Sequence, residues 1–165
     1  MRPTRFETLL VDVAKGLPGV QRVATLAQAE HTAHPIGIAM ELASGAQLWW
    51  QITAVSTPGD VYSAEEGPAV TGAAPEPRAV PDLTVQPLRT AAVEEALAAG
   101  VAAASDEIAS VDTFSSRSPV PAIGYGLAVR FHSGATVFVN GLAHVRAGGP
   151  RPSSSSSFLN LPAEA

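Results

Sequence analysis

Hydrophobic and polar residues alternate along two stretches of this sequence, residues 36–55 and 123–143. In the first stretch, every second residue is apolar on both sides of a Ser-Gly dipeptide at residues 44–45. Alternation on either side of a turn dipeptide predicts a β-hairpin, because successive side chains of a strand point to opposite faces. The second stretch alternates in the same way around its own Ser-Gly dipeptide, at residues 133–134. We therefore expect two hairpins.

The alternation also predicts how each hairpin is paired. A two-residue loop at residues 44–45 would pair Leu42 with Gln47 and mix apolar and polar side chains on one face. A three-residue loop at residues 44–46 pairs Leu42 with Leu48 and keeps one face apolar. Because a slip of one residue exchanges the two faces, we predict the three-residue loop, with its glycine in a left-handed conformation. The second hairpin follows the same rule.

A helix is predicted before each hairpin. Residues 4–16 carry an apolar stripe at helical spacing and end in a Lys-Gly pair. Thr4 and Glu7 match a capping box, in which the two side chains bind free amides of the first turn. The alanine-rich residues 90–104 show a second apolar face, and Thr90 is the expected cap of this helix.

The order helix, strand, hairpin occurs twice along the chain. Residues 37–49 and 126–138 share Gly, Ala, Ser, Gly and Ala at corresponding positions, and a short segment with apolar residues three apart precedes each of them. We interpret these segments, residues 20–28 and 108–114, as strands. Two tandem α-β-β-β repeats predict an α+β fold with a pseudo-twofold antiparallel sheet of about six strands and two helices packed on one face.

These patterns suggest a single pseudo-symmetric domain over residues 1–147. Its first repeat covers residues 3–56 and its second covers residues 88–147. The proline-rich residues 57–87 have no usable periodicity and are expected to form a linker or a surface excursion. Two separate lobes are the alternative, but three strands and one helix would give each lobe a thin core. Residues 148–165 are expected to be a flexible Ser/Pro tail.

The composition excludes several classes of partner. Only 15% of the residues are charged, which leaves much neutral surface for self-association or for a partner. The net charge of −5 and the single lysine argue against binding to nucleic acid. There is no apolar run long enough for a membrane span and no pattern of a secretory signal. With no cysteine for disulfides, we expect a cytoplasmic protein.

The face of the sheet that the helices leave open is the main candidate site. The predicted register places Trp49 opposite Glu41 and Phe138 opposite Arg130, each aromatic residue among glycine and alanine. Exposed apolar surface of this kind is typical of interfaces, where tryptophan and arginine are common anchors. We therefore predict a dimerisation or partner-binding face formed by Trp49, Phe138, Glu41, Arg130, Gln47, Gln51 and His132. Alternatively, residues 57–87 fold over this face, or its aromatic rings pack on neighbouring strands.

A second candidate lies at the end of the tail. The apolar residues Phe158, Leu159 and Leu161 follow five serines, an arrangement typical of a segment that docks on a partner or adds a strand to a sheet edge. The alternatives are that this segment folds back on its own domain or is disordered.

Patterns for catalysis and metal binding are weak. His31 and His34, with Glu30 beside them, resemble the start of a metal site, and His132 and His144 lie far away in sequence. A zinc site needs three or four converging ligands, so we predict no metal and no cofactor. No Gly-x-Ser-x-Gly motif and no phosphate-binding loop is present, and we assign no catalytic residue.

The sequence therefore favours a non-catalytic protein-binding or adaptor module, expected to be a homodimer. One alternative is a small-ligand-binding protein or enzyme whose pocket lies between the sheet and residues 57–87 and uses His132, Arg130 and Glu41. Another is a structural assembly subunit, such as part of a phage or mobile-element particle.

Overall fold

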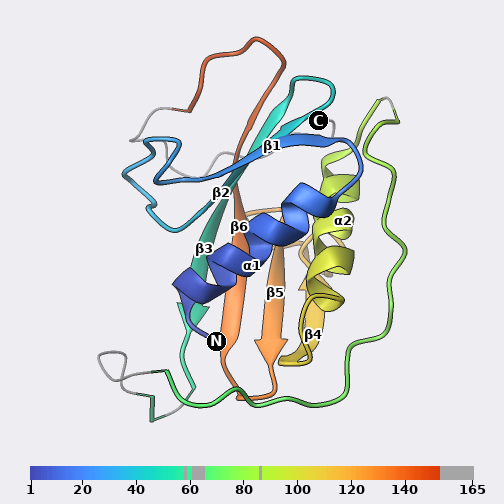
Figure 1. Ribbon diagram of the computed structural model, residues 1–165. Coiled ribbons are helices and arrows are strands. Elements are labelled where there is room, and N and C mark those ends of the chain that lie inside the picture. Colours follow the sequence, from blue (N-terminus) through green and yellow to red (C-terminus); the bar gives the residue numbers. More distant parts are fainter. Residues whose placement is uncertain (58, 61–65, 86, 153–165) are drawn as a thin grey trace.

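Two helices and six strands are found in the part of the chain that the computed structural model describes, residues 1–57, 59–60, 66–85 and 87–152 (Figure 1). In chain order they are α1 (Pro3–Gly16), β1 (Val20–Thr25), β2 (Gly37–Leu42), β3 (Gln47–Val55), α2 (Thr90–Ala102), β4 (Ile108–Thr113), β5 (Gly126–Phe131) and β6 (Thr136–Val145). This confirms the α+β class.

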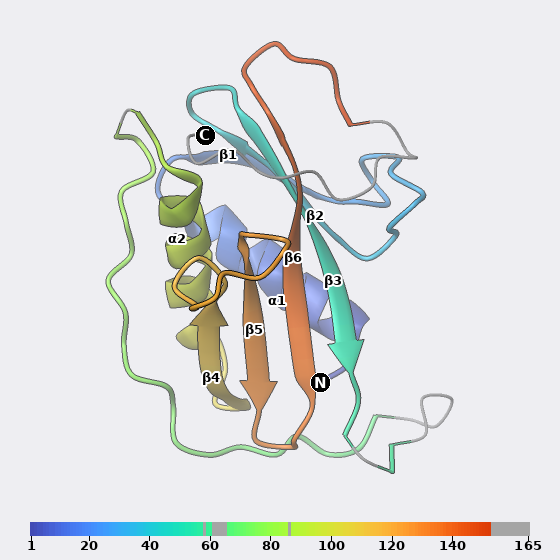
Figure 2. The same ribbon diagram turned by 180° about the vertical axis from the view of Figure 1, so that it is seen from behind.

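All six strands form one antiparallel sheet with the order β1-β2-β3-β6-β5-β4. The sheet curls into a half-barrel (Figures 1 and 2). Its longest ladder joins β3 to β6, from the pair Gln47 and Val145 to the pair Val55 and Thr136. The two hairpins therefore lie side by side at the centre of the sheet, with β1 and β4 at its edges.

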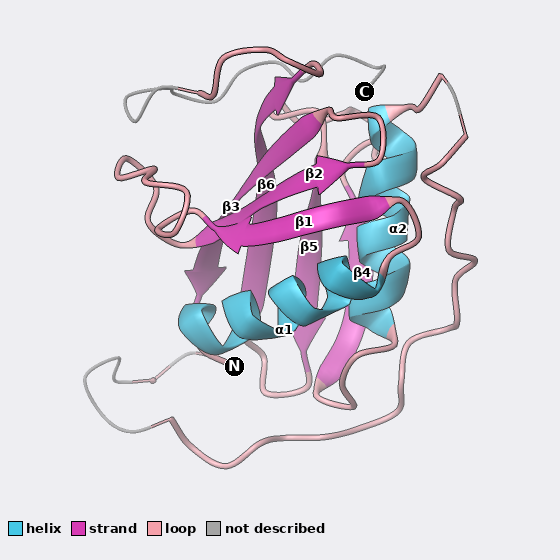
Figure 3. Cartoon of the chain, turned by 45° about the horizontal axis from the view of Figure 1, so that its top comes forward, coloured by secondary structure: helices cyan, strands magenta, loops and turns pink. Residues whose placement is uncertain are grey.

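One large cluster of buried residues draws on both helices and on alternate positions of the strands. Trp50 and Val139, which the alternation places on the apolar side, are completely buried. Figure 3 shows α1 running alongside β1 and across the direction of α2. The helices come so close that a Cβ atom added to Gly100 would lie 2.5 Å from Cγ1 of Val13. The core thus links the two halves of the chain.

Both hairpins are present, but the turns differ from the prediction. Leu42 donates its N–H to Ala46 (2.9 Å), and Gly45 donates to Leu42 (2.8 Å), so the three-residue loop ends at Gly45 rather than at Ala46. Gly45 has the predicted left-handed conformation, with φ +81°. Leu48 consequently lies opposite Met40 instead of Leu42. A shift of two residues leaves every side chain on its predicted face, and for this reason the alternation alone could not detect it.

The second hairpin deviates in the same way. Phe131 donates its N–H to Ala135 (3.0 Å), and Gly134 has φ +86°. Val137 therefore lies opposite Val129 rather than Phe131. In both hairpins the glycine is the last residue of the loop, which is the arrangement of a type I turn followed by a left-handed residue.

Neither predicted helix cap is formed. The N-cap residues are Arg2 for α1 and Arg89 for α2, and neither makes a side-chain capping hydrogen bond. The Glu7 carboxylate accepts the N–H of Gly37, the first residue of β2, at 2.6 Å. Glu94 likewise accepts the N–H of Gly126, the first residue of β5, at 2.6 Å. Each glutamate therefore fixes the start of a hairpin.

The described residues of 57–87 contain no helix or strand, but they are attached to the domain. Arg78 donates hydrogen bonds to the Glu95 carboxylate and to the carbonyl oxygen of Val111, both at 2.9 Å. Leu83 is only 1% exposed. In Figure 1 this green segment passes along the side of α2. Prolines prevent it from joining the sheet, while polar contacts and one buried leucine hold it in place.

Candidate functional site

A small groove crosses β1, β2 and β3 on the sheet face opposite the main core. Its volume is about 180 Å³, and it is lined by residues of the three strands, of the β1–β2 loop and of the segment after β6: Arg22, Ala24, Gln28, Ala29, Ala39, Met40, Glu41, Gln47, Trp49 and Arg151. We call it the Trp49 groove. It brings together three of the predicted partner-binding residues, Trp49, Glu41 and Gln47.

Two cross-strand rows build this groove. Ala24, Ala39 and Trp49 are successive partners in one row, and the next row consists of Arg22, Glu41 and Gln47. Trp49 therefore lies opposite Ala39 rather than opposite Glu41, as the shifted register requires. The first row is apolar, with two small alanines beside Trp49, and the second row is polar. A groove results where two alanines lie beside a large aromatic residue.

Trp49 itself is not an exposed anchor. Its side chain is 2% exposed and packs in a second buried cluster with Leu26, Leu142 and Ala143. The β3–β6 ladder is irregular at this point: Trp49 pairs with Ala143 while Trp50 pairs with Gly141. Leu142 is therefore the extra residue of β6 beside Trp49. The expectation of an exposed tryptophan is thus wrong, and Trp49 contributes to the groove as part of its wall.

The polar row makes few internal contacts. Within the described part of the chain, no ion pair or hydrogen bond joins the side chains of Arg22, Glu41 or Gln47 to another residue. The Arg151 side chain is exposed and also makes none there. Charged groups beside an apolar surface can therefore pair with an incoming molecule at little cost in broken contacts.

The other predicted site residues do not line the groove. Phe138 is half-buried and lies opposite Ala128 rather than Arg130. Arg130 is 54% exposed and forms an ion pair with Asp112. The buried Oε1 of Gln51 has no hydrogen-bond partner within the described part of the chain, and Nε2 of His132 lies 3.1 Å from the carbonyl oxygen of Ala73. Phe158, Leu159 and Leu161 are outside the described residues.

His31 lies beside Trp49, with ring centroids 5.9 Å apart. His31 is 2% exposed, and its ring stacks on His34 with centroids 5.6 Å apart. Neither of its ring nitrogens has a hydrogen-bond partner among the residues that the structure describes. Burial lowers the pKa of His31, and the neighbouring His34 lowers it further. Burial also lowers the pKa of His144. Among the described residues, no three histidine or carboxylate side chains are placed to hold a metal ion.

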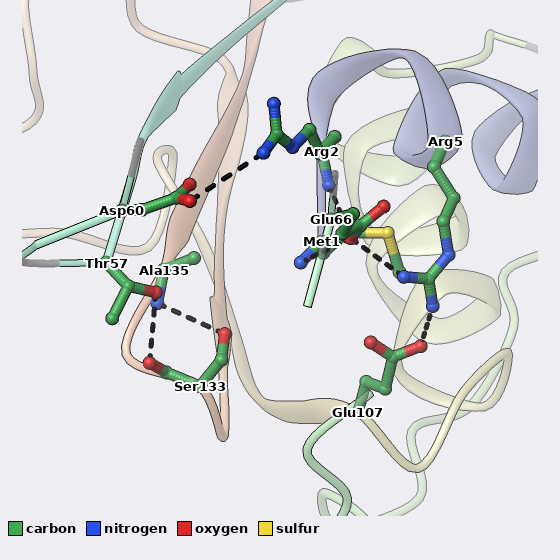
Figure 4. Close-up of polar contacts among 9 residues, drawn as sticks. All are labelled: Met1, Arg2, Arg5, Thr57, Asp60, Glu66, Glu107, Ser133 and Ala135. Atoms are coloured by element: carbon green, nitrogen blue, oxygen red, sulfur yellow. Dashed lines mark hydrogen bonds and ion pairs between the residues drawn. The ribbon is translucent and has the colours of Figure 1, made fainter. Parts of the chain in front are cut away.

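A second pocket, of about 320 Å³, lies between the end of β3, the first residues of 57–87 and the start of the chain (Figure 4). Its central acid is Glu66, which lies 2.9 Å from the Met1 amino group and 2.8 Å from Nη1 of Arg5. Burial alone would raise the pKa of Glu66, but the hydrogen bonds and charges of the amino group and Arg5 together lower it. Arg5 also pairs with Glu107. Sequence reasoning missed this cluster because its members are far apart along the chain.

The second pocket lies where the enzyme alternative expected one, between the sheet and residues 57–87. It contains none of the residues proposed for that pocket, His132, Arg130 and Glu41. Glu66, its central acid, is already paired with two cations, so the arrangement is that of a structural network.

No helix in the described part of the chain is long and apolar enough to cross a membrane. Comparisons with protein-family models, with characterised proteins and with solved structures give no match for this chain.

Proposed function

We propose that this chain is a non-catalytic protein-binding or adaptor module that binds its partner through the Trp49 groove and the surrounding sheet face. The observation that carries the proposal is the pairing of an apolar row with a row of uncommitted polar groups. The groove volume of about 180 Å³ is below the roughly 300–1,000 Å³ typical of small-molecule sites. It suits one or two apolar side chains of a peptide, with Arg22 and Glu41 available for its polar groups.

The partner is either a second copy of this chain or another protein. A homodimer through this face would also cover the half-buried Phe138, which lies further along the same side of the sheet. A cytoplasmic location remains a prediction from the sequence.

We further propose that residues 3–56 and 88–147 are duplicate α-β-β-β units related by a pseudo-twofold axis, with both helices on one face of the sheet. The mirrored strand order supports this, as do the matching hairpin loops that end at Gly45 and Gly134. The two glutamate contacts to the first residues of β2 and β5 also correspond. An experimental structure in which the two halves do not superpose would contradict the duplication.

The binding proposal can be tested with peptides selected against the full chain from a displayed library. We expect selected peptides to carry an apolar side chain beside a charged one. Ala24→Arg should fill the groove and weaken their binding at least tenfold. Gln21→Arg is the matched control, because Gln21 is exposed on the same strand but does not line the groove, and it should bind as the wild type does.

Circular dichroism should show that both variants fold, and light scattering gives the oligomeric state. If the wild type dimerises through this face, Ala24→Arg should be monomeric and Gln21→Arg dimeric. Selected peptides that bind Ala24→Arg as tightly as the wild type would refute the assignment to the groove. A monomeric wild type that selects no peptide would refute the proposed function.

A further inference from the structure

The chain returns to the Trp49 groove after β6 ends. Gly149 donates its N–H to the carbonyl oxygen of Arg146 at 2.9 Å, which turns the segment back. Val145 still pairs with Gln47 on β3, yet Arg151 already lines the groove. Figures 1 and 2 both show the red segment after β6 turning toward the blue loop between β1 and β2. Residues 153–165, outside the described part, therefore follow directly from the rim of the groove.

The length of this tail suits an internal ligand. Phe158 follows Arg151 by seven positions, and seven residues span at most about 25 Å when extended. A serine-rich chain of seven residues has a root-mean-square span of about 13–16 Å, whereas three adjacent strands are only about 10 Å across. The linker can thus return residues 158–161 to the groove, and a tether this short gives an effective concentration in the millimolar range.

The chemistry of the tail matches the groove. Three of the four residues in 158–161 are apolar, and the groove offers an apolar row of two alanines and Trp49. Beyond Arg151 the only charged residue is Glu164. The groove in turn carries two arginines and one glutamate. The groove therefore offers apolar and cationic groups that complement the composition of residues 153–165.

We infer that residues 158–161 occupy the Trp49 groove of their own molecule, as an internal ligand that a partner protein must displace. This inference rests on the proposed function, because it assigns the same groove an occupant. With an effective concentration of about 1 mM and an intrinsic dissociation constant of about 0.1 mM, the tail weakens binding of a competing peptide about tenfold. Replacing Phe158 and Leu161 by serine removes this competition.

The absence of cysteine permits a direct test in the full chain. Gln28→Cys places a thiol at the groove, and Asn160→Cys places one in the tail. The control pair combines Asn160→Cys with Lys15→Cys, in the last turn of α1. Under mild oxidation we expect the groove pair to form an intramolecular disulfide at least five times faster than the control pair, and Phe158→Ser with Leu161→Ser to abolish the difference.

Equal rates for the two pairs would overturn the inference, as would a rate that the serine replacements leave unchanged. Predominantly intermolecular disulfides would also overturn it, because the segment would then bind a second copy. Peptide binding distinguishes this failure from failure of the proposed function. If selected peptides bind the groove while the disulfide forms at the control rate, only the internal ligand is refuted. If the disulfide forms as expected but the serine variant binds no selected peptide and stays monomeric, the proposed function and the displacement by a partner are refuted, while the occupancy of the groove by residues 158–161 is supported.

Discussion

Replacing Glu94 by alanine should destabilise the protein more than the same replacement of Glu7. Both carboxylates bind the first residue of a hairpin, but only Glu94 is completely buried. It accepts hydrogen bonds from three backbone N–H groups and one hydroxyl: Phe114 N–H (3.0 Å), Ser115 N–H (3.3 Å), Gly126 N–H (2.6 Å) and the Ser115 side chain. Glu7 accepts a single partly buried N–H, that of Gly37.

The size of the effect follows from these donors. The bonds from Phe114 and Gly126 are buried, and a buried donor left without a partner costs about 1–3 kcal/mol. Two such donors cost about 2–6 kcal/mol, and removing the buried carboxylate offsets part of this. We expect a loss of about 2–4 kcal/mol for Glu94→Ala and about 1 kcal/mol for Glu7→Ala.

The pH dependence provides a second measurement. Burial raises the pKa of Glu94 above its ordinary value of 4.5, and the hydrogen bonds it accepts offset only part of the rise. The folded state therefore holds this proton more tightly than the unfolded state. The group contributes most to stability below pH 4.5, and the contribution is lost as the pH rises through the raised pKa. Relative to Glu94→Gln, which cannot titrate, the wild type should lose stability over this range.

Urea unfolding at pH 7, and at intervals from pH 4 to 8, measures both quantities. Equal losses for Glu94→Ala and Glu7→Ala at pH 7 would refute the hydrogen-bond argument. A stability difference between wild type and Glu94→Gln that is flat, or that favours the wild type as the pH rises, would refute the argument from burial.

Three further replacements test the packing near the groove and between the helices. Trp49→Ala should lower the free energy of unfolding, measured in urea, by about 3–5 kcal/mol because the ring is buried. A variant as stable as the wild type would show that the ring is not buried. Gly100→Ala should lower the free energy of unfolding by about 1–3 kcal/mol because the new methyl group meets Val13. This loss includes the gain of about 1 kcal/mol in helix propensity that alanine brings. Adding Val13→Ala should recover most of the loss. Burial and the neighbouring His34 lower the pKa of His31, so the melting temperature of the wild type should fall as the pH drops below 6.5. His31→Phe should reduce this fall. The same dependence of melting temperature on pH in the variant and the wild type would contradict the prediction.

The hairpins could be predicted from the sequence because alternation depends only on neighbouring residues. Their register was wrong by two residues, since the predicted loop at residues 44–46 and the observed loop at residues 43–45 both keep Leu42 and Leu48 on one face. The position of glycine at the end of a three-residue loop distinguishes them. Glu7 was interpreted as part of a capping box because that prediction also used only neighbouring residues. Its local pattern fits one, while the donor it binds, Gly37, is close only in the folded chain.

The candidate site was predictable only in part. Trp49, Glu41 and Gln47 were assigned to one face by their spacing, and the structure places them in one groove. The burial of Trp49 agrees with the alternative that its ring packs on neighbouring strands, but the sequence did not identify its contacts, since Leu142 and Ala143 lie far along the chain. Arg22 and Arg151 were missed as well. Neither belongs to a motif, and the fold alone brings them to the same groove.

The β3–β6 ladder has a consequence for how the molecule tolerates a broken backbone. The two hairpins pair along this seam, whereas the covalent connection between them passes through the proline-rich residues 57–87, whose described part contains no strand. Cleavage in that connection would leave two fragments whose exposed strands are each other's best complement. We expect the fragments to remain associated after a nick, so that the protein could be supplied as two separate peptides that reassemble.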